Sequence, residues 1–251
     1  MDNRTIFVCG TYDLIQLIGD SVINSSKKVI FISWDEPIKS TYKKIKIHNV
    51  ENQKQCEDFI MEKSKSKDDF LVSSYWPWKF SKKIVDKFNK NSVNFHPAPL
   101  PKDRGWYPHI HQIRKDEKSG VTLHVIDEKL DTGDIWVQKI FKLPFPITSG
   151  VAHDILKKEI VQIFNDNWNK ILTSKIKPKK QKKGGNFYSK YDLETPEKVK
   201  IENGSKEDIL IRKIASRNFW EKSFIKIQID KDNEKYVHIY FSNDGKLEED
   251  R

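Results

Sequence analysis

A chain of 251 residues, 37% hydrophobic and 33% charged, is long enough for a main domain plus a smaller one, with a modest core under a highly charged surface. No apolar run approaches the ~20 residues that span a bilayer, and the first residues lack the basic and then apolar plan of a signal peptide. We therefore expect a cytoplasmic protein without a membrane partner.

The net charge of +10 indicates the kind of partner, and the two cysteines indicate whether the chain has disulfides or a metal site. A positive surface can attract a nucleic acid or a small anionic substrate, and we expect an anionic substrate and no nucleic-acid partner. Cys9 and Cys56 are single thiols without metal-ligand spacing, so we expect neither a disulfide framework nor a zinc site.

Strand and helix patterns alternate along the first hundred residues. Such alternation predicts an α/β fold with a Rossmann-like sheet, whose active groups lie at the carboxyl ends of the strands. The expected strands are 5–9, 28–33, 69–73 and 92–96, and the expected helices are 12–24, 51–63 and 79–89.

The first strand is followed by Gly10, Thr11 and Tyr12, at the expected start of a helix. These residues lack the glycine pattern of a dinucleotide site, so we do not expect bound NAD. A helix start can hold a phosphate, but the segment could equally be a plain turn.

The segment NFHPAPLPKDRG at 94–105 carries the most specific signal. Alternate side chains of a strand share a face, so Asn94 and His96 point the same way just before three prolines end the strand. Asp131, in the turn LDTGD at 130–134, could complete the group. Amide and imidazole N–H groups can stabilise an oxyanion and a carboxylate can take a proton, which suits acyl transfer to an amine. The alternative is an ordinary cap, a core histidine and a turn aspartate.

The two segments together resemble the folate-dependent formyltransferases, which share N-x-H-x-x-x-L-P-x-x-R-G and a Gly-Val-Thr strand leading to LDTGD. Here Gly120, Val121 and Thr122 supply that strand, and the resemblance covers roughly residues 5–145. It implies that Asn94 and His96 with Asp131 are catalytic and that 10-formyltetrahydrofolate is the cosubstrate.

The resemblance also implies two binding regions. The segment SYWPWKF at 74–80 would line the folate pocket, with Trp78, Lys79 and Phe80 on one wall and Ile126 and Asp127 on the other. The alternative is that these aromatic side chains only pack the core. The amino-sugar substrate would lie across Gly10, Thr11 and Tyr12, with Arg104 as a further contact.

After the Asp131 turn we expect a strand at 135–143 and a long helix at 148–172. We predict a catalytic domain over 1–175 and a small C-terminal region over 176–251. Within this region the lysine-rich run 175–183 reads as a solvated linker or as a phosphate-binding stripe, and 224–229 with 236–241 reads as a β-hairpin. The hairpin is apolar on both faces, so we expect a homodimer that covers it.

Segments 185–189 and 209–216 resemble those that follow the catalytic domain in sugar and tRNA formyltransferases. The C-terminal region is shorter than that of methionyl-tRNA formyltransferases, which favours the nucleotide-sugar enzymes. We expect transfer to a dTDP-linked amino-dideoxysugar, best dTDP-4-amino-4,6-dideoxyglucose, for surface polysaccharide such as the O-antigen of lipopolysaccharide. A 4-amino-arabinose substrate is disfavoured because Trp106 replaces an arginine of that branch. The alternatives are a methionyl-tRNA formyltransferase-like or other formyltransferase and, as a non-enzyme, a basic nucleic-acid-binding module.

Overall fold

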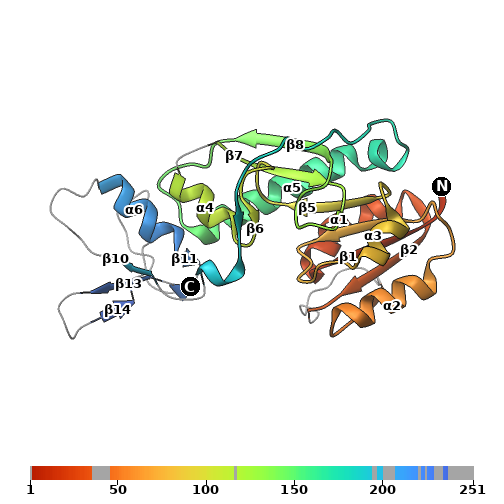
Figure 1. Cartoon of the computed structure of the whole chain (residues 1–251), viewed down its shortest axis with the longest axis horizontal. Helices are drawn as coiled ribbons and strands as arrows, with labels where there is room; N and C mark the ends of the chain where they lie inside the picture. The colour runs from red at the N-terminus through yellow and green to blue at the C-terminus, as the bar shows by residue number, and fades with distance from the viewer. Residues whose placement is uncertain are drawn as a thin grey trace. The chain divides into compact units, whose positions relative to one another are not determined.

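The structure of the protein is a computed structural model, which describes residues 2–35, 46–115, 118–193, 197–199, 207–219, 222–223, 225–228 and 234–236 (Figure 1). The chain forms two compact units. Unit 1 comprises Met1–His96, Val121–Lys139 and Glu159–Gly184, and unit 2 comprises Pro97–Gly120, Ile140–Lys158 and Gly185–Arg251. Each unit thus combines three separate segments of the chain, whereas we predicted two consecutive domains, 1–175 and 176–251. That domain division stays a prediction.

The central sheet has seven strands in the order β3-β2-β1-β4-β5-β7-β8. The five strands from β3 to β5 are parallel, whereas β7 runs antiparallel to β5. This doubly wound order confirms the predicted Rossmann-like sheet. The strands are β1 (Asp2–Gly10), β2 (Ser26–Ser33), β3 (Ile47–Asn49), β4 (Phe70–Ser74), β5 (Ser92–His96), β7 (Ser119–His124) and β8 (Ile135–Phe141).

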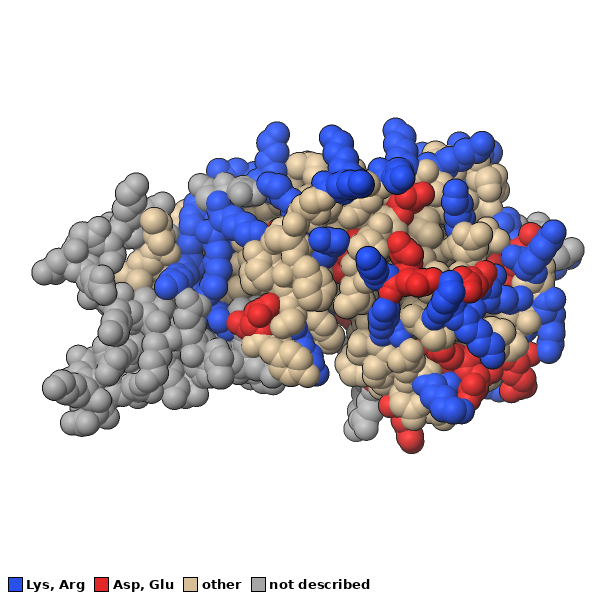
Figure 2. All heavy atoms as spheres, viewed as in Figure 1, with Lys and Arg blue, Asp and Glu red and all other residues tan. Residues whose placement is uncertain are grey.

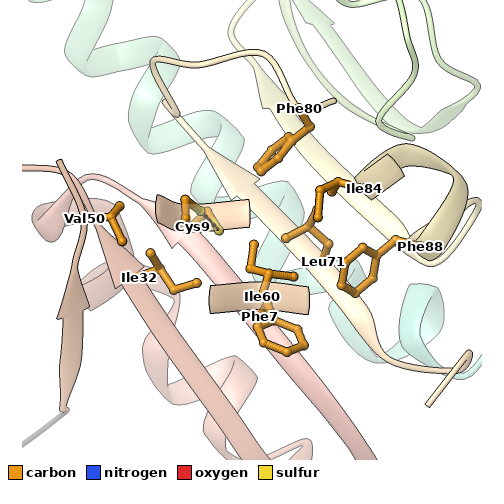
Figure 3. Close-up of a cluster of buried hydrophobic side chains, with 10 residues drawn as sticks. Phe7, Cys9, Ile32, Val50, Ile60, Leu71, Phe80, Ile84 and Phe88 are labelled. Carbon is orange, nitrogen blue, oxygen red and sulfur yellow. Dashed lines mark hydrogen bonds between the residues drawn. The ribbon is translucent and has the colours of Figure 1, made fainter. Parts of the chain in front are cut away.

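Helices cover both faces of this sheet. Leu71 belongs to a buried cluster with residues of α2 (Gln53–Lys63) and α3 (Lys82–Phe88), which Figure 3 shows in close-up. The ring of Phe70, next in the strand, packs against Trp168 of α5 (Ser149–Leu172) at 5.3 Å between centroids. Because adjacent strand residues face opposite sides, α5 lies on the face opposite to α2 and α3. Helix α1 (Tyr12–Ile23) buries one apolar stripe, formed by Leu14, Ile15, Ile18 and Val22.

The expected boundaries hold to within a few residues, with two informative differences. The helix predicted from residue 79 begins at Lys82, because Ser81 ends the preceding loop and donates both its N–H and its hydroxyl to Glu57, at 2.7 and 2.5 Å. The strand predicted to reach residue 143 ends at Phe141.

Unit 2 is built from short elements. They are β6 (Arg104–Gly105), α4 (Pro108–Lys115), β9 (Phe187–Tyr188), a 3-10 helix (Lys190–Leu193), β10 (Glu197–Val199), α6 (Glu207–Ser216), β11 (Asn218–Phe219), β12 (Lys222–Ser223), β13 (Ile225–Gln228) and β14 (Glu234–Tyr236). The antiparallel pairing of β13 with β14 confirms the hairpin. Its second strand comes earlier than predicted, and residues 237–241 lie outside the described residues.

The lysine side chains of the run 175–183 are exposed, but its backbone is anchored to the turn at Asp131. Lys179 pairs with Ile135 through two backbone hydrogen bonds of 2.7 and 2.8 Å, and Gln181 donates to the carbonyl groups of Asp131 and Gly133. The segment therefore holds the turn that carries Asp131.

On the face in Figure 2, lysine and arginine side chains cover much of the described surface, with aspartate and glutamate among them. Among the described helices, none is both long and apolar enough to cross a membrane.

Candidate functional site

Strand β5 places Asn94 and His96 near its carboxyl end, on the same face of the strand. The antiparallel partner strand β7 brings His124 opposite Asn94 and Thr122 opposite His96. His96 is buried and Asn94 half-buried. A proline follows His96 directly, so the strand ends at the residue that carries the imidazole.

The turn after β7 carries Asp131 in the left-handed backbone region, with φ of 55°. Gly133 allows the turn to approach β7 closely, because a Cβ atom there would lie only 1.8 Å from the carbonyl oxygen of Val125. Val125 in turn donates its N–H to the carbonyl of Asp134 at 2.8 Å. Together with the two bonds from Gln181, these contacts fix the position of the Asp131 carboxylate.

The carboxylate of Asp131 lies between two imidazole rings. Its Oδ2 is 3.4 Å from Nδ1 of His96, and its Oδ1 is 3.5 Å from Nε2 of His124. Its side chain is only 11% exposed. The three residues predicted from the motifs are thus brought together, with His124 as a fourth member of the cluster.

His124 also orients the amide of Asn94. Nδ1 of His124 lies 2.8 Å from the carbonyl oxygen of Val125, and since a carbonyl only accepts, Nδ1 donates its proton there. Nδ2 of Asn94, an amide nitrogen that can only donate, lies 3.0 Å from Nε2 of His124, which therefore accepts one amide N–H. This places Nδ2 of Asn94 toward the cluster and gives the amide a second N–H to donate.

The sequence motifs did not identify His124. The available signal was its position two residues after Thr122 in the Gly-Val-Thr strand, which puts both side chains on one face. The pairing register with β5, which the sequence does not state, places that face against Asn94.

Such a cluster can perform acyl transfer chemistry. It offers N–H donors for a developing oxyanion and a buried carboxylate beside an imidazole for moving a proton.

The residues predicted to bind folate lie in one region of unit 1. Trp78 and Ile126 are half-buried and pack against the core cluster that contains Phe80, whose side chain is only 6% exposed. Trp76 and Trp78 meet edge to face at 5.2 Å. A partly exposed aromatic wall of this kind fits a planar ring, whereas Phe80 could contribute only through its backbone.

Lys79 and Asp127 are the two charged residues of the predicted folate site. Lys79 is exposed. Asp127 accepts hydrogen bonds from the N–H of Glu128 at 2.7 Å and the hydroxyl of Thr132 at 3.1 Å, so it shapes the turn before Asp131. Folate binding by these residues stays a prediction.

The predicted phosphate site at the start of α1 already holds a carboxylate. The N–H of Tyr12 donates to both oxygens of Asp35, at 2.9 and 3.2 Å, and the hydroxyl of Thr11 donates to Asp13. A phosphate here would displace a group of the same charge. Gly10 has a packing role, because a Cβ atom there would lie 2.1 Å from Oγ of Ser74. Substrate binding at 10–12 remains a prediction.

Arg104 lies in unit 2, in the segment that follows β5. Its N–H donates to Asn186, and β6 pairs with β9 in parallel. Asp103, next to it, binds both Lys115 at 2.6 Å and the side-chain amide of Asn186 at 3.0 Å. Nε of Arg104 is buried and has no hydrogen-bond partner among the described residues, which suits a residue that binds an anion.

The two cysteines lie together in the core of unit 1. Their sulfur atoms are 4.0 Å apart and both thiols are free. Burial raises the pKa of the Cys9 thiol well above its ordinary value. Both residues therefore act as small core side chains.

A Rossmann-like sheet that ends in an Asn, His and Asp cluster is the arrangement that the resemblance to the formyltransferases implies. The family model described as formyl transferase matches residues 19–164, which is more than half of the chain. The chain belongs to this family, and the predicted resemblance is confirmed.

Two curated relatives act on different substrates, one on a nucleotide sugar and one on methionyl-tRNA. The dTDP-4-amino-4,6-dideoxyglucose formyltransferase of Mycobacterium bovis is 29% identical over 126 residues, which cover 50% of this chain and 53% of that protein. The methionyl-tRNA formyltransferase of Clostridium tetani is 31% identical over 177 residues, covering 64% and 57%. The chain thus spans about half the length of the curated relatives it matches.

Solved structures share the fold over more of the chain. A 4-N formyltransferase from Francisella tularensis aligns with a TM-score of 0.81 at 22% identity, over 95% of this chain and 98% of that one. An N-formyltransferase from Helicobacter canadensis, in complex with folinic acid and dTDP-3-aminofucose, aligns with a TM-score of 0.66 at 21% identity, over 87% and 82%. At these identities the likeness establishes the fold alone.

Proposed function

We propose that the protein is a folate-dependent sugar N-formyltransferase. It transfers a formyl group from 10-formyltetrahydrofolate to the amine of a dTDP-linked amino-dideoxysugar. The observation that carries this proposal is the buried cluster, with His96 3.4 Å from Asp131 and Asn94 held by His124. The likeness in fold to the Francisella tularensis 4-N formyltransferase and to the Helicobacter canadensis enzyme, which was solved with folinic acid and dTDP-3-aminofucose, supports the choice of substrate class.

The finer proposal is that the substrate is dTDP-4-amino-4,6-dideoxyglucose, the activity of the Mycobacterium bovis relative. The product would enter surface polysaccharide synthesis, such as the O-antigen of lipopolysaccharide. The enzyme would act in the cytoplasm as a homodimer.

Bound 10-formyltetrahydrofolate supplies the formyl carbon as an electrophile. The neutral sugar amine attacks that carbon, a C–N bond forms, and the bond from the formyl carbon to the folate nitrogen breaks. Asn94 donates its second N–H to the oxygen on which negative charge develops. His96 turns Nδ1 toward Asp131, so its Nε2 is the nitrogen that would donate to the same oxygen.

Asp131 has two tasks in this scheme. Its carboxylate balances a positive charge on His96 across 3.4 Å, and it accepts the proton that the amine loses, directly or through water. The proton balance closes when the departing folate nitrogen gains a proton.

The test is a formylation assay with a panel of acceptors. The protein is incubated with 10-formyltetrahydrofolate and each of several amino-sugar nucleotides, differing in amine position and base, and with methionyl-tRNA. Mass spectrometry should detect the gain of one formyl group on a dTDP-linked amino sugar. Formylation of methionyl-tRNA alone would select the second candidate, which the 31% identity to the Clostridium tetani enzyme favours.

Two substitutions tie the activity to the cluster. Loss of one oxyanion donor costs roughly 2.7 to 4 kcal/mol, or on the order of 100- to 1,000-fold in rate. Asn94→Ala and His96→Ala should each lose at least this much turnover while keeping the circular dichroism spectrum of the unmodified protein. Near-normal turnover in either variant would contradict the assignment. Salt-sensitive nucleic-acid binding without transfer would instead support the basic-module alternative.

A further inference from the structure

A buried glutamine bridges the two strands that carry the catalytic cluster. Gln112, on helix α4, is 4% exposed. Its side-chain Nε2 donates to the carbonyl of Pro97 at 2.7 Å, and its Oε1 accepts from the N–H of Gly120 at 3.1 Å. Pro97 directly follows His96, and Gly120 lies near the start of β7, four residues before His124.

The backbone pairing of β5 with β7 ends at His96. Strands β5 and β7 pair at three positions, from Asn94 with His124 to His96 with Thr122. Proline has no N–H to donate, so pairing of the usual kind stops where β5 gives way to Pro97. Beyond this point the side chain of Gln112 connects the two segments, because its carboxamide provides one donor for Pro97 and one acceptor for Gly120.

We propose that Gln112 is a positioning residue for the catalytic strands. It fixes the peptide that follows His96 relative to β7, and thereby the placement of His96 against Asp131 and of Asn94 against His124. The proposal rests on the proposed function, because it gives Gln112 a role in the same formyl transfer. Gln112 contacts no reacting atom and acts only through the two backbone groups that it holds.

The two bonds require both halves of the carboxamide. A carboxylate at this position could still accept from Gly120, but only a protonated carboxyl group could also donate to Pro97. Burial next to a carbonyl group disfavours the ionised form. The variant Gln112→Glu therefore restores the bridge at low pH and breaks it at high pH, whereas Gln112→Leu breaks it at every pH.

The experiment compares these variants with the unmodified protein and with Ile113→Ala. Ile113 is 2% exposed on the same helix and packs in the core with Leu143, Ile147 and Ala152, and the two bridging hydrogen bonds belong to Gln112 alone. Its substitution controls for loss of stability. All assays are done at a temperature at which circular dichroism shows each variant folded, over a range of pH.

For Gln112→Leu we expect kcat to fall on the order of 10- to 100-fold, with both KM values changed less than about threefold. For Gln112→Glu, kcat relative to the unmodified protein should rise as the pH falls. This ratio should stay flat for Gln112→Leu, and Ile113→Ala should keep kcat near normal. Normal kcat in folded Gln112→Leu, or an equal loss in folded Ile113→Ala, would overturn the proposal. If Gln112→Leu does not fold, a pH-independent ratio in Gln112→Glu would overturn it.

A second readout separates this inference from the proposed function. Hydrogen exchange followed by NMR should show the amide of Gly120 protected in the unmodified protein and exposed in Gln112→Leu, with shifted imidazole signals of His96. If the unmodified protein formylates no acceptor, the function fails while these signals still report on positioning. Unchanged His96 signals in Gln112→Leu would defeat the positioning role even in an active enzyme.

Discussion

At the scale of single residues, the four members of the cluster are brought together in two different ways. Asn94 and His96 belong to one strand and would share a face in any fold that keeps this strand. Asp131 and His124 reach them only because a turn and a neighbouring strand return to the same point. The proposed formyl transfer uses all four residues, because Asn94 and His96, which would donate to the oxyanion, are oriented by His124 and Asp131.

We predict that Asp131→Asn keeps the shape of the site and removes its charge. Turnover should fall by at least about 100-fold, the scale of general acid–base catalysis, with little change in sugar-nucleotide binding. Steady-state kinetics together with calorimetric titration of the sugar nucleotide would measure both. A large loss of binding at near-normal turnover would instead make Asp131 a binding residue.

At the scale of elements, the Asp131 turn depends on its close approach to β7. Gly133→Ala should displace the turn, because the added Cβ atom would meet backbone at 1.8 Å. We expect this variant to lose most of its activity and to melt at a lower temperature. The contact is with a carbonyl group, which has no flexible side chain to yield.

Gly184→Ala is the matched control for this prediction. Gly184 has φ of +101° but no atom within 4 Å of a built Cβ, so alanine there costs only backbone strain, on the order of 1 to 3 kcal/mol. Activity assays and thermal melts of both variants measure the difference. Equal behaviour of the two would mean that the turn tolerates displacement.

At the scale of the whole molecule, unit 2 contains a histidine buried in its neutral form. His109 packs against the rings of His153 and Phe219, at 5.5 and 5.8 Å. Burial, and secondarily His153 and His111, lowers the pKa of His109 to about 3. Below the ordinary value of about 6.5 the unfolded chain binds a proton that the folded chain does not, so stability falls as the pH drops from about 6.5 toward about 3.

We therefore expect His109→Gln, which cannot titrate, to reduce this acid sensitivity. Within the window the histidine contributes a slope of up to about 1.4 kcal/mol per pH unit. Urea unfolding of both proteins at pH 7, 6 and 5 would measure it. Parallel stability curves would show that His109 takes up its proton equally in the folded and the unfolded chain, which would contradict the lowered pKa.

The hairpin of β13 and β14 is the basis of the proposed homodimer. Sedimentation at micromolar concentration should give about twice the mass of one chain. Deletion of residues 220–251, most of which lie outside the described residues, should give a soluble monomer if the hairpin is only a dimer arm. A full-length monomer would contradict the proposal, and insolubility of the deletion would show that the hairpin belongs to the fold.

The sequence alone determined the features that depend on local periodicity and on long motifs. The period of two in β5 placed Asn94 and His96 together, and alternating apolar runs predicted the parallel sheet. The LDTGD turn identified Asp131 because glycine and aspartate mark such turns without any tertiary information. The family and the fold predicted from these features were confirmed by the family match and by the solved structures.

Only the tertiary structure decided the contacts between segments far apart in the chain. Asp35 occupies the start of α1, Gln181 holds the Asp131 turn and Gln112 bridges β5 to β7, each at hydrogen-bond distance. His124 meets Asn94 through the register of an antiparallel pair. The physical reason is that a hydrogen bond between distant segments imposes no repeating pattern on the sequence of either segment. A buried strand or a turn, in contrast, restricts the types of residue at neighbouring positions of the same segment.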